Sequence, residues 1–154
     1  MTDPQFFQEI RTFLSNWRTM SLATVDEQGR AHAANIQFAL DENFALYYVS
    51  SVNSAHSKHI VLDPQIAATI YAHTDDHTQI HGIQLHGQCI EVTDPAERKR
   101  AWEIYVNRFT FISGNPNFER HLRSESFFKV TPTWVRWIDN RRGFGFKEER
   151  LLSA

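Results

Sequence analysis

The sequence predicts a mainly β protein: a closed antiparallel barrel of six strands with flanking helices. Three observations favour this class. Six segments of strand composition are joined mostly by tight turns, the helical segments are few and short, and the alternating strand–helix units of a doubly wound sheet are missing from the sequence. The GxGxxG and GxxxxGK[ST] signatures do not occur either, so neither a Rossmann nor a P-loop nucleotide site is expected.

The first half of the chain begins with a helix and continues with strands. Asp3 is a good N-cap and Pro4 suits the first helical position, and apolar residues then recur at helical spacing as far as Trp17. Gly29 supplies the conformational freedom that a tight turn needs. The strands expected here cover 20–25, 31–40 and 44–50, with turns at 26–29 and 41–43.

The second half alternates short helices with longer strands. Asn53 or Ser54 is expected to cap a short helix that ends before Asp63 and Pro64. Asp94 is the expected N-cap of a second helix, with Pro95 at its first position. The remaining elements are strands over 66–73, 79–92 and 126–139 and a short helix over 117–123. We expect one domain over residues 3–147, followed by a charged C-terminal tail over 148–154.

Composition narrows the class of protein. The formal net charge of −2 supplies no basic field, so nucleic acid is not an expected partner. The single cysteine, Cys89, excludes an intramolecular disulfide and suits a reducing compartment. No apolar run is long enough to span a bilayer, and the N-terminus lacks the basic and apolar regions of a signal peptide. We therefore expect a cytoplasmic protein with no membrane association.

The aromatic content is high, with 12 Phe, 4 Trp and 4 Tyr. One interpretation is a well-packed barrel or a large apolar dimer interface, because aromatic residues serve packing first. The other is a platform for a flat heterocycle.

The segment from Phe44 to Pro64 carries the strongest functional signal. An aromatic strand ends in small hydroxyl and amide residues, and a short basic segment then opens a helix. Hydroxyls, backbone N–H groups and cations at one helix start suit a bound anion, most naturally a phosphate. The alternative is that these residues only cap the helix. The residues are Ser50, Ser51, Asn53, Ser54, His56, Lys58 and His59.

Other chemistry finds little support in the sequence. His73, His77 and His81 share strand parity and could align across a turn, but no Cys or HExxH element accompanies them, so no metal site is expected. No GxSxG elbow is present, and we assign no catalytic residue.

The order of these elements resembles the pyridoxamine 5'-phosphate oxidase-like superfamily of FMN-binding split barrels. The resemblance covers about residues 10–147. It rests on the stretch MSLATVDEQGRAHAANIQFALDENFALYYVSSVNSAHSKHIVLDPQIAATI and on HGIQLHGQCIEVTDPAERKRAWEIYVNRF, which matches a strand–Gly–strand unit followed by a helix starting at TDP. The segment DNRRGFGFKEER resembles a small uncharacterised subgroup of that superfamily.

The resemblance implies a six-stranded antiparallel split barrel that forms a homodimer with FMN at the subunit interface. It implies that Asn35, Ile36, Tyr48, Val49, Ser50 and Ser51 border the flavin, that Ser54, His56, Ser57 and Lys58 lie at its phosphate, and that His81, Gly82 and Gln84 approach from the partner subunit.

One residue departs from the pattern. His56 occupies the position where the superfamily usually has Lys, and a neutral imidazole supplies less positive charge than an ammonium group. Relatives also use deazaflavin or bind haem. The expected function is an FMN-dependent oxidoreductase of unknown substrate, with a non-catalytic carrier of haem, deazaflavin or another small ligand as the alternative. No Arg-x-His pair lies near the C-terminus, so pyridoxamine phosphate is not the expected substrate.

Overall fold

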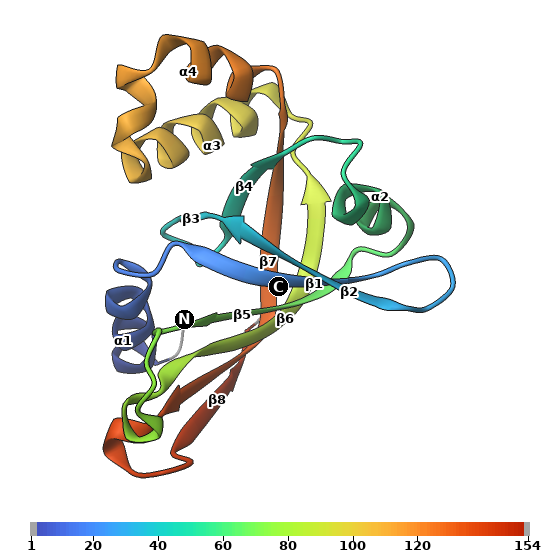
Figure 1. Ribbon diagram of the computed structural model, residues 1–154. Helices are drawn as coiled ribbons and strands as arrows, with labels where there is room; N and C mark the ends of the chain where they lie inside the picture. The colour runs from blue at the N-terminus through green and yellow to red at the C-terminus, as the bar shows by residue number, and fades with distance from the viewer. Residues whose placement is uncertain (1–2, 153–154) are drawn as a thin grey trace.

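The computed structural model describes residues 3–152, which form one antiparallel sheet of eight strands with four α-helices around it (Figure 1). The predicted mainly β class with flanking helices is confirmed. The strands are β1 (Thr19–Val25), β2 (Ala31–Gln37), β3 (Ala39–Leu40), β4 (Leu46–Ser50), β5 (Gln65–Tyr71), β6 (His81–Glu91), β7 (Ser126–Asp139) and β8 (Lys147–Leu151). The helices are α1 (Pro4–Leu14), α2 (Ala55–Leu62), α3 (Pro95–Arg108) and α4 (Pro116–Arg123), with 3₁₀ turns η1 (His77–Gln79), η2 (Thr110–Gly114) and η3 (Asn140–Arg142).

A kink in the chain completes the ring of strands. The sheet order is β2-β1-β5-β6-β7-β4-β3, so its two ends are β2 and β3, which only Phe38 separates in the sequence. The Phe38 N–H donates to the Arg18 carbonyl at 3.0 Å, and the Phe38 side chain is buried. The strand predicted over 31–40 is therefore one bent segment, which pairs first with β1 and then with β4.

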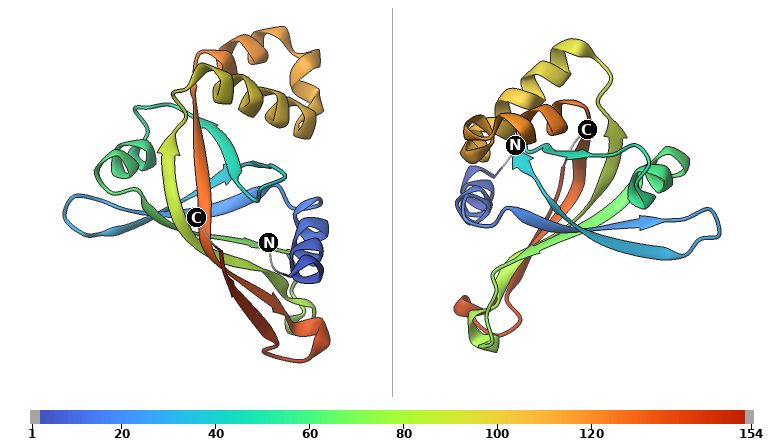
Figure 2. Two further views of the ribbon diagram at one scale, coloured as in Figure 1. Left: turned by 180° about the vertical axis from the view of Figure 1, so that it is seen from behind. Right: turned by 45° about the horizontal axis from the view of Figure 1, so that its top comes forward.

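Strand β7 holds the two ends of the molecule together. It pairs with β6 from Phe128 to Asp139, with β4 through residues 126–130, and with β8 through residues 134–138. Figures 1 and 2 show the α3–α4 hairpin at one end of this strand and β8 near the other.

The segment expected as a charged tail from residue 148 is a strand as far as Leu151. The charged side chains of this segment form ion pairs with residues elsewhere in the chain. Glu149 accepts a hydrogen bond from Arg136 at 2.8 Å, and Arg150 donates to Asp3 at 2.6 Å. Charged side chains are common on an edge strand because they discourage pairing with other molecules. Residues 153–154 lie outside the described part of the chain.

The barrel interior is the main core, and α1 covers one end of it. Asp3 accepts a hydrogen bond from the Phe6 N–H at 3.1 Å, which caps the helix as predicted. The apolar stripe of α1 is buried as its spacing predicts. Its buried residues are Phe6, Phe7, Ile10, Phe13 and Leu14.

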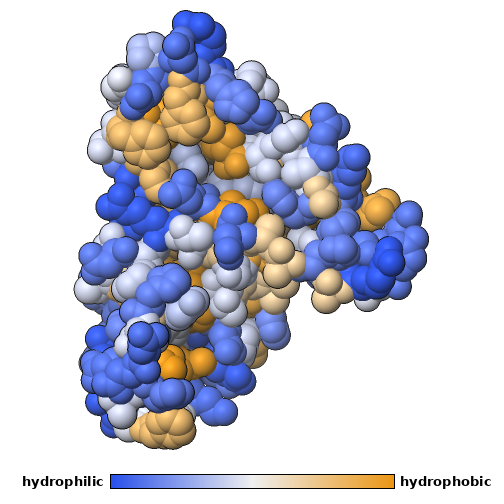
Figure 3. Space-filling view, viewed as in Figure 1, coloured by the Kyte–Doolittle hydropathy of each residue, from blue (hydrophilic) through white to orange (hydrophobic). Residues whose placement is uncertain are grey.

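A second apolar cluster lies under α3, on the outer side of β4 and β7. Tyr47 and Phe127 contribute from the sheet, and Ala101 and Tyr105 from the helix. Many of the aromatic residues therefore serve packing. The surface seen in Figure 3 is mostly polar, with apolar residues exposed beside α3 and α4.

No helix within residues 3–152 is long and apolar enough to cross a membrane.

Candidate functional site

The end of β4 and the start of α2 form a compact cluster of hydroxyl groups. Ser54 is the N-cap of α2, as predicted, and its Oγ accepts from the Ser57 N–H at 3.3 Å. The Ser54 Oγ lies 3.3 Å from the Ser50 Oγ and 2.7 Å from the Ser57 Oγ. The Ser51 carbonyl accepts from the Ser57 hydroxyl at 2.7 Å. These four residues, which we call the serine cluster, thus meet at one helix start.

His56 joins the serine cluster. Its Nε2 lies 2.7 Å from the Ser50 Oγ, and the ring is half-buried. Burial, and then the charge of nearby His59, lowers the pKa of His56 below its usual value. The imidazole is therefore neutral at pH 7, so in the ligand-free protein it brings no fixed positive charge to the serine cluster.

Lys58 lies on a different side of α2. With Ala55, Asn53 and His59 it lines a cavity between α2 and the β1–β2 hairpin. His59 Nδ1 is 2.8 Å from the Thr24 Oγ1, which ties the helix to that hairpin. The structure therefore brings Ser50, Ser51, Ser54, His56 and Ser57 together and leaves Lys58 apart from them.

The residues expected to border the flavin ring differ in exposure. Asn35 is on the outer face of β2, where its side-chain oxygen accepts from the Ser21 hydroxyl at 2.8 Å. Ile36 points into the barrel core. Tyr48 is 0% exposed and stacks on Phe128 with ring centroids 5.3 Å apart, so within one subunit it is a core residue. Val49 packs at the edge of the cluster under α3.

The three residues expected from the partner subunit lie on two faces of β6, because neighbouring residues of a strand point to opposite sides. His81 shares the inward face with Ile83 and Leu85 and packs against Phe13, with ring centroids 5.4 Å apart. Gln84 is on the outer face and accepts from Arg136 at 3.2 Å. Gly82 also belongs to that outer face, and a Cβ added to it would lie 2.3 Å from the Ile70 carbonyl oxygen.

The outer face of β1, β2, β5, β6 and β7 carries a group that the sequence reasoning missed. The rings of His86 and Trp134 lie 4.5 Å apart, and the Arg136 guanidinium lies 5.0 Å from the Trp134 ring. A cavity of about 440 Å³ opens beside His86 and is walled mainly by small residues, among them Ala23 and Ala67. The sequence could have indicated this group. Trp134 and Arg136 are two residues apart in a strand, so they lie on one face, and the other face of that strand is apolar.

The histidines suggested for metal binding have other neighbours. The His73 ring lies 4.7 Å from the Tyr71 ring, and His81 Nδ1 lies 2.8 Å from the Gln79 carbonyl oxygen. No group of three or more His, Cys, Asp or Glu residues within the described chain is placed to hold a metal ion.

Comparison with known proteins places the chain among relatives of the same architecture. The family model described as pyridoxamine 5'-phosphate oxidase matches residues 6–139. The chain is 27% identical to the UPF0306 protein plu4501 of Photorhabdus laumondii subsp. laumondii, with 96% of each chain covered.

Solved structures share the fold at low sequence identity. The conserved hypothetical protein Rv2991 from Mycobacterium tuberculosis superposes with a TM-score of 0.76 at 19% identity, covering 88% of this chain and 85% of that one. HutZ, the haem storage protein from Vibrio cholerae, gives a TM-score of 0.68 at 19% identity, covering 81% of this chain and 88% of that one. At such identities the likeness shows the fold alone.

Proposed function

The chain belongs to the pyridoxamine 5'-phosphate oxidase family, and we propose that it is an FMN-binding flavoprotein with the cofactor at a homodimer interface. The observation that carries this proposal is the serine cluster. It gathers hydroxyls and a helix start at the rim of the barrel, where the resemblance expects the FMN phosphate.

The donor set of this rim fits a phosphate. The first-turn N–H groups of Ala55 and His56 have no acceptor within the helix, and the helix dipole favours an anion there. The Ser50 and Ser54 hydroxyls can turn toward a ligand oxygen, because a hydroxyl rotor is free to exchange partners. Phosphate recognition here therefore depends on neutral donors and on His56, whose proton affinity a phosphate dianion would increase.

The flavin ring is proposed to lie over the uncovered sheet face. Asn35 and Val49 would border it from one subunit, and Gly82 and Gln84 of the partner subunit would approach from the other. The FMN, when bound, would supply the hydride or electron transfer of an oxidoreductase.

The direct test of the cofactor is the visible spectrum of the purified protein with and without added FMN. A flavin band, and FMN binding that Ser54→Ala and His56→Ala weaken, would support the proposal. Lys58→Ala is the matched control, since Lys58 lines another cavity and should leave FMN affinity nearly unchanged. A colourless protein that fails to bind FMN would refute it.

The proposed dimer has its own test. The outer sheet face carries small residues around the cavity beside His86, and no helix of residues 3–152 covers it in Figures 1 and 2. Ala67→Arg puts a long charged side chain on that face and should convert a dimer to a monomer in sedimentation velocity. FMN binding that persists unchanged in such a monomer would contradict the interface site.

A second candidate is a non-catalytic carrier of haem. It is favoured by the fold shared with HutZ, which is a haem storage protein, and by the eight histidines of the chain. A Soret band on addition of haemin, with no flavin band on addition of FMN, would select this function. The same titration with a deazaflavin tests the remaining alternative.

A further inference from the structure

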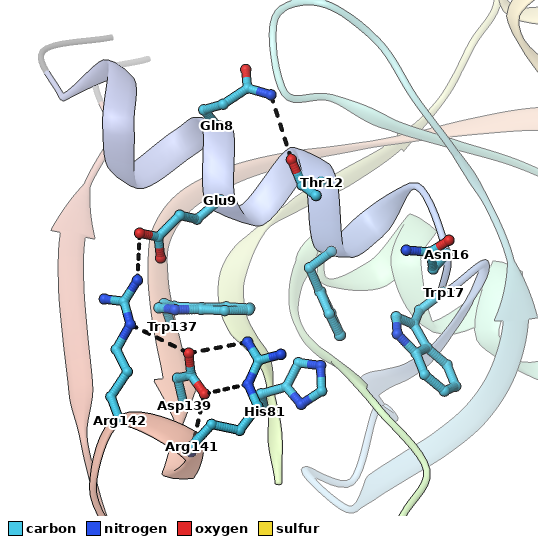
Figure 4. Close-up of a pocket in the computed structure, with 11 residues that line it drawn as sticks. Gln8, Glu9, Thr12, Asn16, Trp17, His81, Trp137, Asp139, Arg141 and Arg142 are labelled. Atoms are coloured by element: carbon cyan, nitrogen blue, oxygen red, sulfur yellow. Dashed lines mark hydrogen bonds and ion pairs between the residues drawn. The ribbon is translucent and has the colours of Figure 1, made fainter. Parts of the chain in front are cut away.

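A cavity of about 400 Å³ lies between α1 and the far ends of β6 and β7 (Figure 4). It is separate from the serine cluster, because α1 and α2 lie on opposite sides of the barrel in Figures 1 and 2. Its walls combine aromatic rings with an ion network around the buried Asp139. The rings are Phe13, Trp17, His81 and Trp137, and the ionic residues include Asp139, Arg141 and Arg142.

The ionic part of the wall is centred on the Asp139 carboxylate. Asp139 is 3% exposed and accepts two hydrogen bonds from the Arg141 guanidinium, at 2.7 and 3.1 Å. Arg142 lies 3.4 Å from the same carboxylate and also pairs with Glu9. Among the residues that line the cavity, Glu9 and Asp139 balance Arg141 and Arg142, and Glu148 behind them is shared between Arg142 and Arg150. The cavity therefore has no net charge with which to select an ion.

The same network leaves hydrogen-bonding groups open toward the cavity. Arg141 uses Nε and Nη2 for Asp139, and its Nη1 makes no hydrogen bond within residues 3–152. His81 Nδ1 lies 2.8 Å from the Gln79 carbonyl oxygen, which only accepts, so in the neutral imidazole the proton is on Nδ1 and Nε2 is an acceptor. Nε2 has no hydrogen-bond partner within the described residues. The Arg141 donor and the His81 acceptor therefore line the same cavity, as Figure 4 shows, and so does the indole of Trp137, whose buried Nε1 donor has no partner within the described residues.

From these features we propose that the cavity is a second ligand site, for a neutral planar heterocycle with a lactam edge. The aromatic walls match a flat apolar body, since offset and edge-on ring contacts stabilise it beyond simple burial. The absence of net charge disfavours a carboxylate or an ammonium ion, whose desolvation would go uncompensated. A lactam edge carries one N–H for His81 and one carbonyl oxygen for Arg141.

The test is calorimetric titration of the protein with 2-quinolinone, with N-methyl-2-quinolinone and quinoline-2-carboxylate as matched ligands. We expect binding of 2-quinolinone and at least about tenfold weaker binding of the N-methyl compound, because an unpaired polar group then remains buried. Preferential binding of the carboxylate, or equal binding of the two quinolinones, would overturn the ligand class.

Two variants locate the site. Thr12 is exposed at the rim of the cavity on α1, so Thr12→Tyr should obstruct the cavity without disturbing the core. Asn107→Tyr makes the same change at an exposed position of α3, away from the cavity, and should leave binding unchanged. His81→Phe keeps a ring and removes the acceptor, and it should weaken binding while circular dichroism shows a folded protein. Undiminished binding in Thr12→Tyr would refute the site.

The FMN titration separates this inference from the proposed function. Thr12 has no part in the serine cluster, so Thr12→Tyr should bind FMN as the unmodified protein does. Loss of 2-quinolinone binding with retained FMN binding would support two separate sites. Parallel loss of both would mean that the cavity is not an independent site.

Discussion

Replacing His56 with lysine is the sharpest test of how the phosphate is held. The His56 imidazole is neutral at pH 7 because burial lowers its pKa, and its Nε2 reaches the Ser50 Oγ at 2.7 Å. A lysine at this position would bring a charged donor to the same rim. Net hydrogen bonds are worth roughly 0.5–1.5 kcal/mol between neutral groups and roughly 1.5–3 kcal/mol when one partner is charged. A gain of about 1 kcal/mol lowers the FMN Kd roughly fivefold.

Flavin fluorescence quenching at pH 8 measures this gain, since histidine is neutral and lysine charged at that pH. Two controls isolate the phosphate contact. Val61→Lys adds the same charge to the same helix at a position that is 80% exposed, and it should change the Kd little. Riboflavin lacks the phosphate, so its affinity should be the same in His56→Lys and in the unmodified protein.

Two results would refute this reasoning. Unchanged FMN affinity in His56→Lys, in a protein that melts normally, would mean that the phosphate lies elsewhere. An equal gain for riboflavin would mean that the lysine acts on the ring or on the fold.

Three further predictions concern stability and reactivity. Gly82→Ala should destabilise the protein by about 3 kcal/mol in urea unfolding, because the new Cβ would lie 2.3 Å from a backbone oxygen, whereas Gly114→Ala, with open space around it, should stay within about 0.5 kcal/mol. Burial raises the pKa of the Cys89 thiol to about 11. Ellman's reagent at pH 8 should therefore react with Cys89 only after the protein is denatured. Rapid reaction with the native protein would contradict the buried position of this thiol. The hydrogen bond with His32 lowers the pKa of Asp26 in the folded protein. The ionised carboxylate therefore stabilises the fold at any pH above the unfolded-state pKa, and this stabilisation is lost as the pH falls through the folded-state pKa. Thermal melts of Asp26→Asn should therefore show a deficit at pH 7 that shrinks in acid, and a deficit independent of pH would exclude the ionic explanation.

Periodic and local signals in the sequence predicted much of the fold. The stripe on α1 and the Ser54 cap depend on neighbours within one helical turn, so a single segment contains all that is needed to infer them. The break at Phe38 has no such local cause. It arises because the segment must leave β1 and join β4, and that requirement exists only in the closed sheet.

The candidate site was predicted in part. The serine cluster and His56 come from one continuous segment, and the structure brings them together. Lys58 lies apart from the serine cluster, and helix geometry explains why. Residues two apart on a helix point to nearly opposite sides, as His56 and Lys58 do. Side chains that are an odd number of residues apart on a strand point to opposite faces, which places His81 and Gln84 on different faces of β6.

The pairing of β6 with β7 has a consequence for the order in which the molecule opens. Both strands lie between other strands along most of their length, so their amides should exchange with solvent only on global unfolding. Strand β4, which ends at Ser50 of the serine cluster, is attached to β7 through five residue pairs and to a two-residue strand on its other side. The rim can therefore fluctuate while the centre of the barrel stays closed. Amide protection should thus decrease from Leu85 and Val135 toward Ser50, which places the proposed cofactor rim in a part of the sheet that opens before its centre.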